Sequence, residues 1–320
     1  MESQEPLISC IVPLYNTRQH LAQCVESLLA QTYGNIEFVF VDDCSTDGSL
    51  AKLKELLANH PRRHCCKVTG NDVNRGPAAA RAIGINSATG DYLMFCDSDD
   101  WVDPDMAGGL MDIAIGNDSD IVCSSYHEHT PGQERTIRLA PNAGIDLNNA
   151  PIDTLHFALW NKLFRASLIK QNALHNFTAA KCWDDLAITA PAIALSRRTI
   201  TTGKAYYHYR HDTASNSLTA QRHHIRLEDH LLVARHVEGW FTENGLATQY
   251  EPFLKFLKFT SKIKMLRGEA IDTARWKSTF PETNRGIMGY SNIPLRYRLA
   301  LQAANLLPAS FTQRIASLLK

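Results

Sequence analysis

A short apolar run that ends abruptly in acidic residues constrains this chain more than any other feature. Residues 93–96 are long enough for a buried strand but too few for a helix, and Asp97, Asp99 and Asp100 follow at once. These carboxylates therefore lie at the carboxyl end of a strand, where open α/β sheets bind ligands. Because adjacent carboxylates repel one another, we expect a cation such as Mg²⁺ or Mn²⁺, or a basic side chain, beside them. For an isolated Asp-x-Asp, an acidic turn before a helix is the more common alternative.

The first 125 residues alternate between strand-like and helix-like segments. The expected strands are 7–12, 36–41, 67–69, 93–96 and 120–125, and the expected helices are 21–29, 50–57, 77–88 and 106–115. The helix at 77–88 is rich in small residues, so we expect it to pack close to a sheet. Such alternation with short connections predicts an α/β fold, with a mostly parallel sheet covered by helices on both faces.

A second expected strand, 36–41, also ends in acids, at Asp42 and Asp43. Two strand ends that carry carboxylates predict a ligand-binding crevice at the carboxyl edge of the sheet. The first strand is not followed by G-x-G-x-x-G, and G-x-x-x-x-G-K-[ST] does not occur, which disfavours dinucleotide and P-loop sites. Phosphates would then be held through a metal ion on the acids.

Composition limits the setting of the protein. Eight cysteines occur without a C-x-x-C pair, and the N-terminus shows no signal peptide, so we expect a reducing cytoplasm. No apolar run reaches membrane-spanning length. The 33 basic residues equal the 33 acidic ones, and we expect no nucleic-acid partner.

Five sequence blocks follow one another across residues 7–105. They are V-P-L-Y-N at 12–16, S-L-L-A-Q-T-Y at 27–33, V-D-D-C-S-T-D-G-S at 41–49, N-R-G at 74–76 with A-R at 80–81, and G-D-Y at 90–92 leading into D-S-D-D at 97–100. One block alone would be weak, but in this order they resemble the family-two inverting glycosyltransferases with the GT-A fold, of the bacterial surface-polysaccharide type. The resemblance continues to about residue 220, through W-N-K-L-F-R at 160–165 and Y-H-Y-R at 207–210.

This resemblance implies a nucleoside-diphosphate-sugar donor, usually a UDP-sugar. Pro13 and Tyr15 fall where the family holds the nucleotide base, and Asp43 falls on the acid that accepts from the base N–H. Asn74 and Arg81 fall on further contacts to the base and ribose. A solvated helix face remains the alternative for Arg81, as an ordinary loop aromatic does for Tyr15.

The resemblance also implies a metal site. Asp97 and Asp99 match the family's D-x-D, with Asp99 in direct contact with Mn²⁺ or Mg²⁺, and Asp100 as a cap or supporting partner. His208 corresponds to a histidine that can complete the metal site, although a tyrosine-flanked histidine in a strand is more often packed. His211 is a substitute for it.

The catalytic base implied by the resemblance is Asp185. The family has Glu-Asp here, whereas this chain has Asp184 before the base, and either acid could instead cap the helix that follows. A carboxylate is needed because a sugar hydroxyl is a poor nucleophile until its proton is removed. The expected reaction is inverting transfer of a hexosyl or N-acetylhexosaminyl group to a glycan or lipid-linked acceptor in polysaccharide biosynthesis. A nucleotide-sugar-binding homologue without turnover is the alternative, and a nucleotidyltransferase is a distant third.

The expected domains are a catalytic domain at 1–220 and a helical region at 221–320. Within the first, 1–125 would bind the nucleotide-sugar and 126–220 would supply the acceptor site and the base. Residues 251–320 contain 12 Lys or Arg against four acids, and the segments 294–299 and 315–320 resemble basic amphipathic helices. Such helices can lie on the inner face of the cell membrane, and a solvated helical cap or a homodimer contact is the equal alternative.

Overall fold

The computed structural model describes residues 5–149, 157–211, 223–266, 272–289 and 293–307. The chain divides into two compact units, of which the first comprises Met1–Ile145 and Phe157–Ala220. The second comprises Asp146–His156 and Gln221–Lys320. How the functions divide between these parts of the chain stays a prediction.

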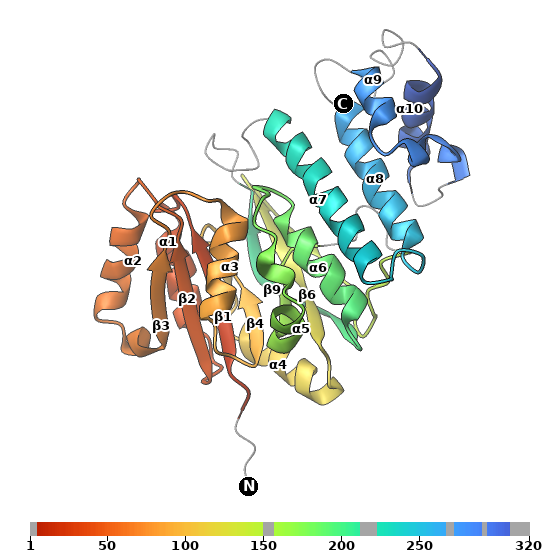
Figure 1. Ribbon diagram of the computed structural model, residues 1–320. Coiled ribbons are helices and arrows are strands. Elements are labelled where there is room, and N and C mark those ends of the chain that lie inside the picture. Colours follow the sequence, from red (N-terminus) through yellow and green to blue (C-terminus); the bar gives the residue numbers. More distant parts are fainter. Residues whose placement is uncertain (1–4, 150–156, 212–222, 267–271, 290–292, 308–320) are drawn as a thin grey trace. The chain divides into compact units, whose positions relative to one another are not determined.

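The described part of the first unit contains a nine-stranded sheet (Figure 1). Its strands are β1 (Ile8–Leu14), β2 (Ile36–Asp42), β3 (Cys66–Gly70), β4 (Tyr92–Phe95), β5 (Trp101–Val102), β6 (Ile121–Thr130), β7 (Gln133–Ile137), β8 (Lys162–Arg165) and β9 (Thr199–Arg210). Their order is β3-β2-β1-β4-β8-β6-β9-β5, with β7 paired to β6. This is the expected α/β fold.

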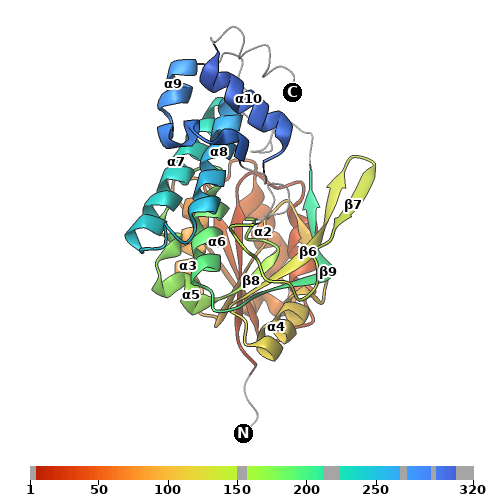
Figure 2. The ribbon, with the colours of Figure 1, turned by 90° about the vertical axis from the view of Figure 1, so that its right-hand side faces the viewer.

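The sheet is parallel only in part. Strands β3, β2, β1 and β4 run parallel, as the alternating pattern predicts. Beyond them β8 is antiparallel to both β4 and β6, while β6 and β9 are parallel. The polar stretch after residue 125 forms the β6–β7 hairpin, with Gly132 at φ 77° in its turn, and Figure 2 shows this hairpin projecting from the sheet. The sheet is therefore mixed rather than mostly parallel.

Helices cover both faces of this sheet (Figures 1 and 2). One face carries α1 (Leu21–Leu29), α2 (Ser49–Ala58) and α4 (Met106–Asn117), and the other carries α3 (Pro77–Ser87), α5 (Ala166–Gln171) and α6 (Asp184–Leu195). Successive side chains of β1 point to opposite faces of the sheet. Cys10 and Val12 pack in the core with α1, α2 and α4, whereas Ile11 faces α3. Residues on both faces of β1 are buried, which explains why its sequence is a continuous apolar run.

Helix α3 approaches the sheet closely, as its small residues predict. A Cβ added at Gly84 would lie 2.4 Å from Cγ2 of Ile11 and 3.3 Å from Cγ2 of Val41. Because both neighbours are buried in β1 and β2, only glycine fits at this distance. The close approach places the first turns of α3, and with them Arg81, near the carboxyl ends of these strands.

The second unit is helical. It contains α7 (His223–Glu243), α8 (Glu251–Leu266), α9 (Thr273–Ser278) and α10 (Leu295–Leu306). Two lysines of the basic helix α8 are buried: Lys258 pairs with Glu238 and Glu282, and Lys262 lies 4.0 Å from the ring centroid of Trp276. Burial lowers the pKa of Lys262 to about 8. Part of the positive charge of this region is therefore internal.

One of the two helices that the sequence suggests near the C-terminus lies in the described part of the chain. Helix α10 covers most of segment 294–299, and segment 315–320 lies outside the described residues. No helix in the described part of the chain combines the length and apolar character needed to cross a membrane.

Candidate active site

The acidic residues after β4 form a tight turn. The backbone N–H of Asp100 donates to the carbonyl oxygen of Asp97 at 3.1 Å. The hydroxyl of Tyr207 accepts from the N–H of Asp97 at 3.1 Å and donates to Oδ2 of Asp100 at 2.7 Å. Oδ1 of Asp100 accepts from the N–H of Arg210 at 2.7 Å. Tyr207 thus holds both ends of the turn, and Asp100 is a supporting residue of it.

The side chain of Asp100 is 1% exposed. Burial, with the charges of Asp99 and Asp97, raises the pKa of Asp100 well above its ordinary value. Asp97 and Asp99, by contrast, are only half-buried, so these two carboxylates are the accessible ones of the turn.

Arg81 joins the acidic turn to the start of α6. Its guanidinium is buried in α3 and contacts three carboxylates: Nη2 lies 2.8 Å from Oδ1 of Asp97, and Nη1 lies 2.5 Å from Oδ2 of Asp184 and 3.1 Å from Oδ1 of Asp185. A solvated helix face is therefore excluded for Arg81. Its expected contact to the base and ribose stays a prediction, and its partners in the structure are acids.

The two acids at the start of α6 are not helix caps. Trp183 occupies the N-cap position, with φ 64° and no side-chain capping bond. Asp184 and Asp185 lie in the first turn and direct their carboxylates to Arg81. The left-handed backbone at a bulky residue costs free energy, so the surrounding structure must hold Trp183 there. This conformation places both acids beside the turn after β4.

Asp185 combines a buried carboxylate oxygen with a raised pKa. Its Oδ2 accepts from the N–H of Leu159 at 3.3 Å, whereas its buried Oδ1 has no hydrogen-bond partner among the described residues. Arg81 lies at ion-pair distance from Oδ1 but is not aligned for a hydrogen bond. Burial raises the pKa of Asp185 to about 7, with Arg81 opposing and Asp184 and Asp97 adding to the rise. A carboxylate with a pKa near neutrality is suited to accept a proton at physiological pH.

The residues expected to hold the nucleotide base lie around the ends of β1 and β2. The ring of Tyr15 is 42% exposed, and Asn74 is exposed. Asp43 is buried and accepts three hydrogen bonds, from Nδ2 of Asn71 at 2.7 Å and from the N–H groups of Arg75 at 2.9 Å and Gly76 at 2.7 Å. Asp43 therefore holds the segment that leads into α3, and its contact with a base stays a prediction.

Left-handed backbone marks two of these loops. Asn16, after the expected base-binding residues Pro13 and Tyr15, has φ 53°, and Cys44, directly after Asp43, has φ 62°. Oδ1 of Asn16 accepts from the N–H of Thr46 at 2.8 Å, which ties the loop after β1 to the loop after β2. These turns keep the exposed ring of Tyr15 near the carboxyl edge of the sheet.

The structure does not bring His208 to Asp97 and Asp99. Tyr207 points to the acidic turn, so the next residue in β9 faces the other way. Nε2 of His208 lies 3.0 Å from Oδ1 of Asp103, and its Nδ1 lies 2.9 Å from Nε2 of His129. His208 is therefore packed and hydrogen-bonded, and its role as a metal ligand stays a prediction.

His211 and Trp160 both lie among side-chain partners within the first unit. Nε2 of His211 lies 3.7 Å from Oε1 of Glu128. Trp160, in the block that carries the resemblance, is buried and stacks on the rings of Tyr207 and Tyr209, so it belongs to the core. The neighbouring Lys162 is fully buried as well.

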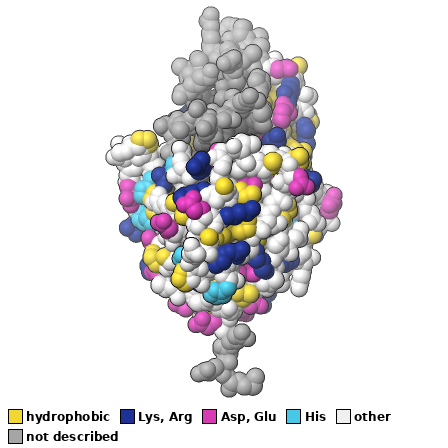
Figure 3. Space-filling view, turned by 90° about the vertical axis from the view of Figure 1, so that its left-hand side faces the viewer, with side chains coloured by type: hydrophobic (Ala, Val, Ile, Leu, Met, Phe, Trp, Pro, Cys, Tyr) yellow, Lys and Arg dark blue, Asp and Glu magenta, His cyan; other side chains and the backbone are white. Residues whose placement is uncertain are grey.

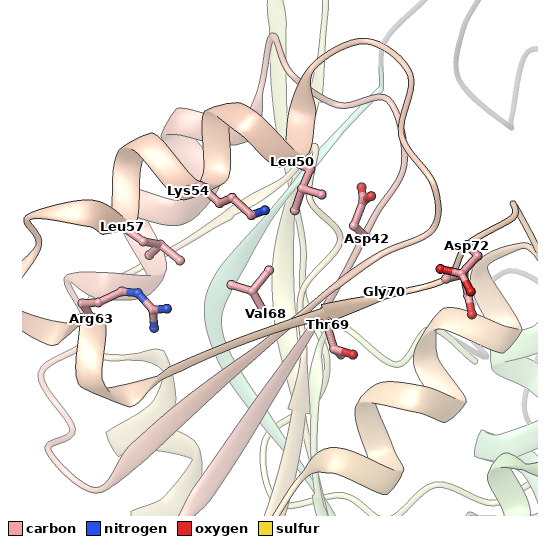
Figure 4. A pocket seen from close by; sticks show the side chains of 10 residues that line it. Asp42, Leu50, Lys54, Leu57, Arg63, Val68, Thr69, Gly70 and Asp72 are labelled. Atoms are coloured by element: carbon pink, nitrogen blue, oxygen red, sulfur yellow. The ribbon is translucent and has the colours of Figure 1, made fainter.

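A cavity of about 530 Å³ lies apart from these acids, between α2 and β3 (Figure 4). Lys54 and Arg63 lie on one side of it and Asp42 and Asp72 on the other. Figure 3 shows basic side chains gathered around hydrophobic ones on the side of the molecule where α2 and β3 lie. Asp42, one of the acids expected at the strand ends, lines the cavity, whereas Asp43, Asp97, Asp99 and Asp185 do not.

Comparison with known proteins decides the family. Residues 9–173, more than half of the chain, match the model of glycosyl transferase family 2. The chain belongs to this family. The resemblance found in the sequence and the GT-A type of α/β fold with a helical C-terminal region are thereby confirmed.

Individual relatives differ in how much of their length is shared. Glycosyltransferase GlyA of Streptococcus pneumoniae is 32% identical over 63% of this chain, which spans only 30% of GlyA. The uncharacterized glycosyltransferase EpsJ of Bacillus subtilis is 26% identical over 98% of this chain and 95% of its own length. Residues 1–349 of TarS from S. aureus, solved with UDP-GlcNAc, share the fold with a TM-score of 0.74 at 20% identity, over 97% of this chain and 90% of that one.

Proposed function

We propose that this glycosyltransferase transfers a hexosyl or N-acetylhexosaminyl group from a UDP-sugar, with inversion, to a hydroxyl of a glycan or lipid-linked acceptor in polysaccharide biosynthesis. The observation that carries this proposal is the buried Oδ1 of Asp185, which has no hydrogen-bond partner among the described residues and is linked through Arg81 to Asp97. A base and an acidic turn held by one guanidinium suit a reaction in which a proton is removed near a leaving diphosphate.

The proposed step forms one bond and breaks one. The acceptor hydroxyl attacks the anomeric carbon, and Oδ1 of Asp185 takes its proton. The bond between that carbon and the diphosphate oxygen breaks, and the nucleoside diphosphate leaves with the electron pair. Because attack and departure take place on opposite faces, the anomeric centre is inverted.

The accessible carboxylates of the turn fit a hard divalent cation. Asp97 keeps 28% of its side chain exposed although Arg81 contacts its Oδ1, and Asp99 is half-buried beside it. Oxygen ligands of this kind are those that Mg²⁺ and Mn²⁺ prefer. We propose that Asp99, with Asp97, holds such an ion, which when bound neutralises charge on the leaving diphosphate.

The choice of a uridine nucleotide rests on the base-binding loops and on the shared fold. The exposed ring of Tyr15 is available to pack on a base, and Pro13, Asp43 and Asn74 lie around the same strand ends. TarS, which has this fold, was solved with UDP-GlcNAc.

The test is release of nucleoside diphosphate from a panel of UDP-, GDP- and dTDP-sugars with Mn²⁺, and again in EDTA. We expect release from one UDP-sugar, its loss on chelation and in Asp99→Ala, and preserved donor binding without release in Asp185→Asn. Turnover retained by Asp185→Asn would contradict the assignment of the base. Binding without release, with any glycan or lipid-linked acceptor, would favour a nucleotide-sugar-binding homologue.

We also propose that the helical region touches a membrane surface that carries a lipid-linked acceptor. Helix α10 exposes Leu295, Leu299 and Leu306, which share one face of the helix by their spacing, and Arg296 is exposed beside them. Such a helix suits an anionic surface. Co-sedimentation with anionic vesicles should decrease in Leu299→Glu, and a change only in the oligomeric state would instead indicate a homodimer contact.

A further inference from the structure

A group of histidines lies on one face of the sheet around β6 and β9, apart from the acidic turn. His127 in β6 is the register partner of His208 in β9, and His208 is in turn the partner of Trp101 in β5. Asp103 follows β5 directly, and its N–H donates to the carbonyl oxygen of Tyr206 at 2.8 Å. Three separate segments of the chain therefore deliver ligand-type side chains to one place.

Three of these side chains are close enough to share a metal ion. One ligand atom each from Asp103, His127 and His208 lies within 4.8 Å of the others. Among the described residues, no other group of three His, Cys, Asp or Glu side chains lies this close together. Oδ1 of Asp103 and Nε2 of His208 are already 3.0 Å apart. Around a tetrahedral ion with ligand bonds of about 2.0–2.1 Å, ligand atoms lie about 3.3 Å apart. Because an imidazole binds an ion in the plane of its ring, the ring of His127 has to turn out of its stack on His208 to complete the set.

The remaining ring nitrogens have the partners that metal-bound histidines use. Nδ1 of His127 lies 3.1 Å from Oε1 of Glu134 and 3.1 Å from Oγ1 of Thr136, both in β7. Nδ1 of His208 lies 2.9 Å from Nε2 of His129. A carboxylate or another acceptor on the distal nitrogen fixes the tautomer of a ligating histidine and orients its ring.

The ring of His208 is also held by packing. The ring of His208 stacks between those of Trp101, at 4.9 Å between centroids, and His127, at 4.7 Å. The side chains are nevertheless accessible, with exposed fractions of 15% for His208, 21% for His127 and 38% for Asp103. An ion from solution can reach these atoms without opening the fold.

We propose that Asp103, His127 and His208 form a binding site for a borderline transition metal ion, with Zn²⁺ as the representative, distinct from the hard-cation site proposed on Asp97 and Asp99. Imidazole nitrogen suits Zn²⁺, Ni²⁺ and Co²⁺, whereas Mg²⁺ and Mn²⁺ prefer oxygen. Three protein ligands leave a position for water. The bound ion connects Asp103, which follows β5, to β6 and β9. Because β5 begins directly after the acidic turn, the role of the ion is to brace that turn.

Metal binding to the purified chain, with any affinity tag removed and residual metal stripped by chelation, tests this proposal. Titration with Co²⁺, followed by its visible absorption, and with Zn²⁺, followed by calorimetry and by the thermal unfolding midpoint, should show one equivalent bound without any nucleotide-sugar. Mg²⁺ in large excess should not compete. Absence of Zn²⁺ and Co²⁺ binding to the intact chain would overturn the proposal.

Matched variants identify the ligands. Asp103→Asn and His127→Gln should each lose at least tenfold in Zn²⁺ affinity and most of the Zn²⁺-dependent rise in the unfolding midpoint. Glu134→Gln, a positioning change, should lose about 10–100-fold while keeping the Co²⁺ spectrum of the same ligand set. His211→Gln, a nearby histidine outside the group, should bind as the unchanged chain does. Equal affinity in His127→Gln, Asp103→Asn and the unchanged chain would place the metal elsewhere and contradict the assignment.

Discussion

Nη1 of Arg81 lies 3.1 Å from Oδ1 of Asp185, although α3 and α6 are separated by about a hundred residues of chain. The same guanidinium lies 2.8 Å from Asp97 in the turn after β4. One buried side chain thus bridges the expected base and the expected metal-binding turn. Arg81 also lowers the pKa of Asp185, against burial, which raises it.

Replacing Asp185 by Asn should lower kcat by about 10²–10⁴-fold, because the proton acceptor is removed while its size is kept. The dissociation constant for the donor should change little. Steady-state kinetics and calorimetric donor binding measure the two effects. Asp112→Asn, an equal charge change on the exposed face of α4, is the control, and a loss of less than tenfold in Asp185→Asn would argue against its role.

Activity should rise with pH through about 7. Burial raises the pKa of Asp185 to about 7, so the carboxyl is protonated below that pH and cannot accept the proton of the acceptor hydroxyl. Below pH 7, kcat/KM for the acceptor should fall about tenfold per pH unit, and it should level off above pH 7. A profile measured between pH 5.5 and 8.5 that stays flat would show that another group accepts the proton.

Replacing Arg81 by Met should destabilise the fold by about 3–5 kcal/mol, because the buried Asp184 loses its cationic partner. The pKa of Asp185 should rise further, since Arg81 lowers it, and the activity profile should shift to higher pH. Arg81→Lys keeps the charge without the planar fork and should recover only part of the loss. Urea unfolding measures the stability, and equal stability of all three proteins would contradict the linking role of Arg81.

Replacing Tyr207 by Phe should cost about 1–3 kcal/mol and loosen the acidic turn, because the hydroxyl bridges Asp97 and Asp100. Activity at limiting Mn²⁺ should fall more than activity at saturating Mn²⁺. Tyr33→Phe is the matched control, since its hydroxyl donates to the carbonyl oxygen of Pro6 at 2.6 Å, away from the turn. If activity depended on the Mn²⁺ concentration identically in the two variants, the Tyr207 hydroxyl would not be needed for metal binding at the turn.

Replacing Gly84 by Ala should destabilise the first unit by about 1–3 kcal/mol, because the added methyl group overlaps Ile11 at 2.4 Å. Gly116→Ala, in α4, has no heavy atom within 4 Å of the added Cβ and should be neutral or stabilising by up to about 1 kcal/mol. Thermal unfolding of both variants distinguishes steric overlap from helix propensity. A stable Gly84→Ala would mean that α3 shifts away from β1 at little cost.

Local patterns predicted the parallel half of the fold. Each apolar run up to residue 96 became a strand, and the small residues of 77–88 became the helix that packs closely on β1. The position of β8, antiparallel between β4 and β6, could not be predicted. The spacing of hydrophobic residues indicates which face of a strand is buried, but it does not indicate which strand lies beside it.

The sequence places acids at the strand ends where motif and strand end coincide, and their roles stay predictions. The expected residues Asp97 and Asp185 meet through Arg81, whose ionic partners no local pattern reveals, since Asp184 lies 103 residues away. For His208 the limit was the alternation of β9: sequence alone does not tell that Tyr207 takes the face toward the turn. Sequence alone does not bring Asp103 and His127 together either, because their proximity depends on the pairing of β5, β6 and β9.

The three hydrogen bonds that Asp43 accepts limit which residues can be substituted to change the preferred sugar donor. A substitution at Asp43 would release Asn71 and the N–H groups of Arg75 and Gly76, and so disturb the entry into α3 before it altered any contact with a base. Loss of activity after such a change would therefore say little about nucleotide choice. In the proposed donor site, the exposed side chains of Tyr15 and Asn74 are the positions at which laboratory evolution of a new donor can begin, because variation there leaves the scaffold intact.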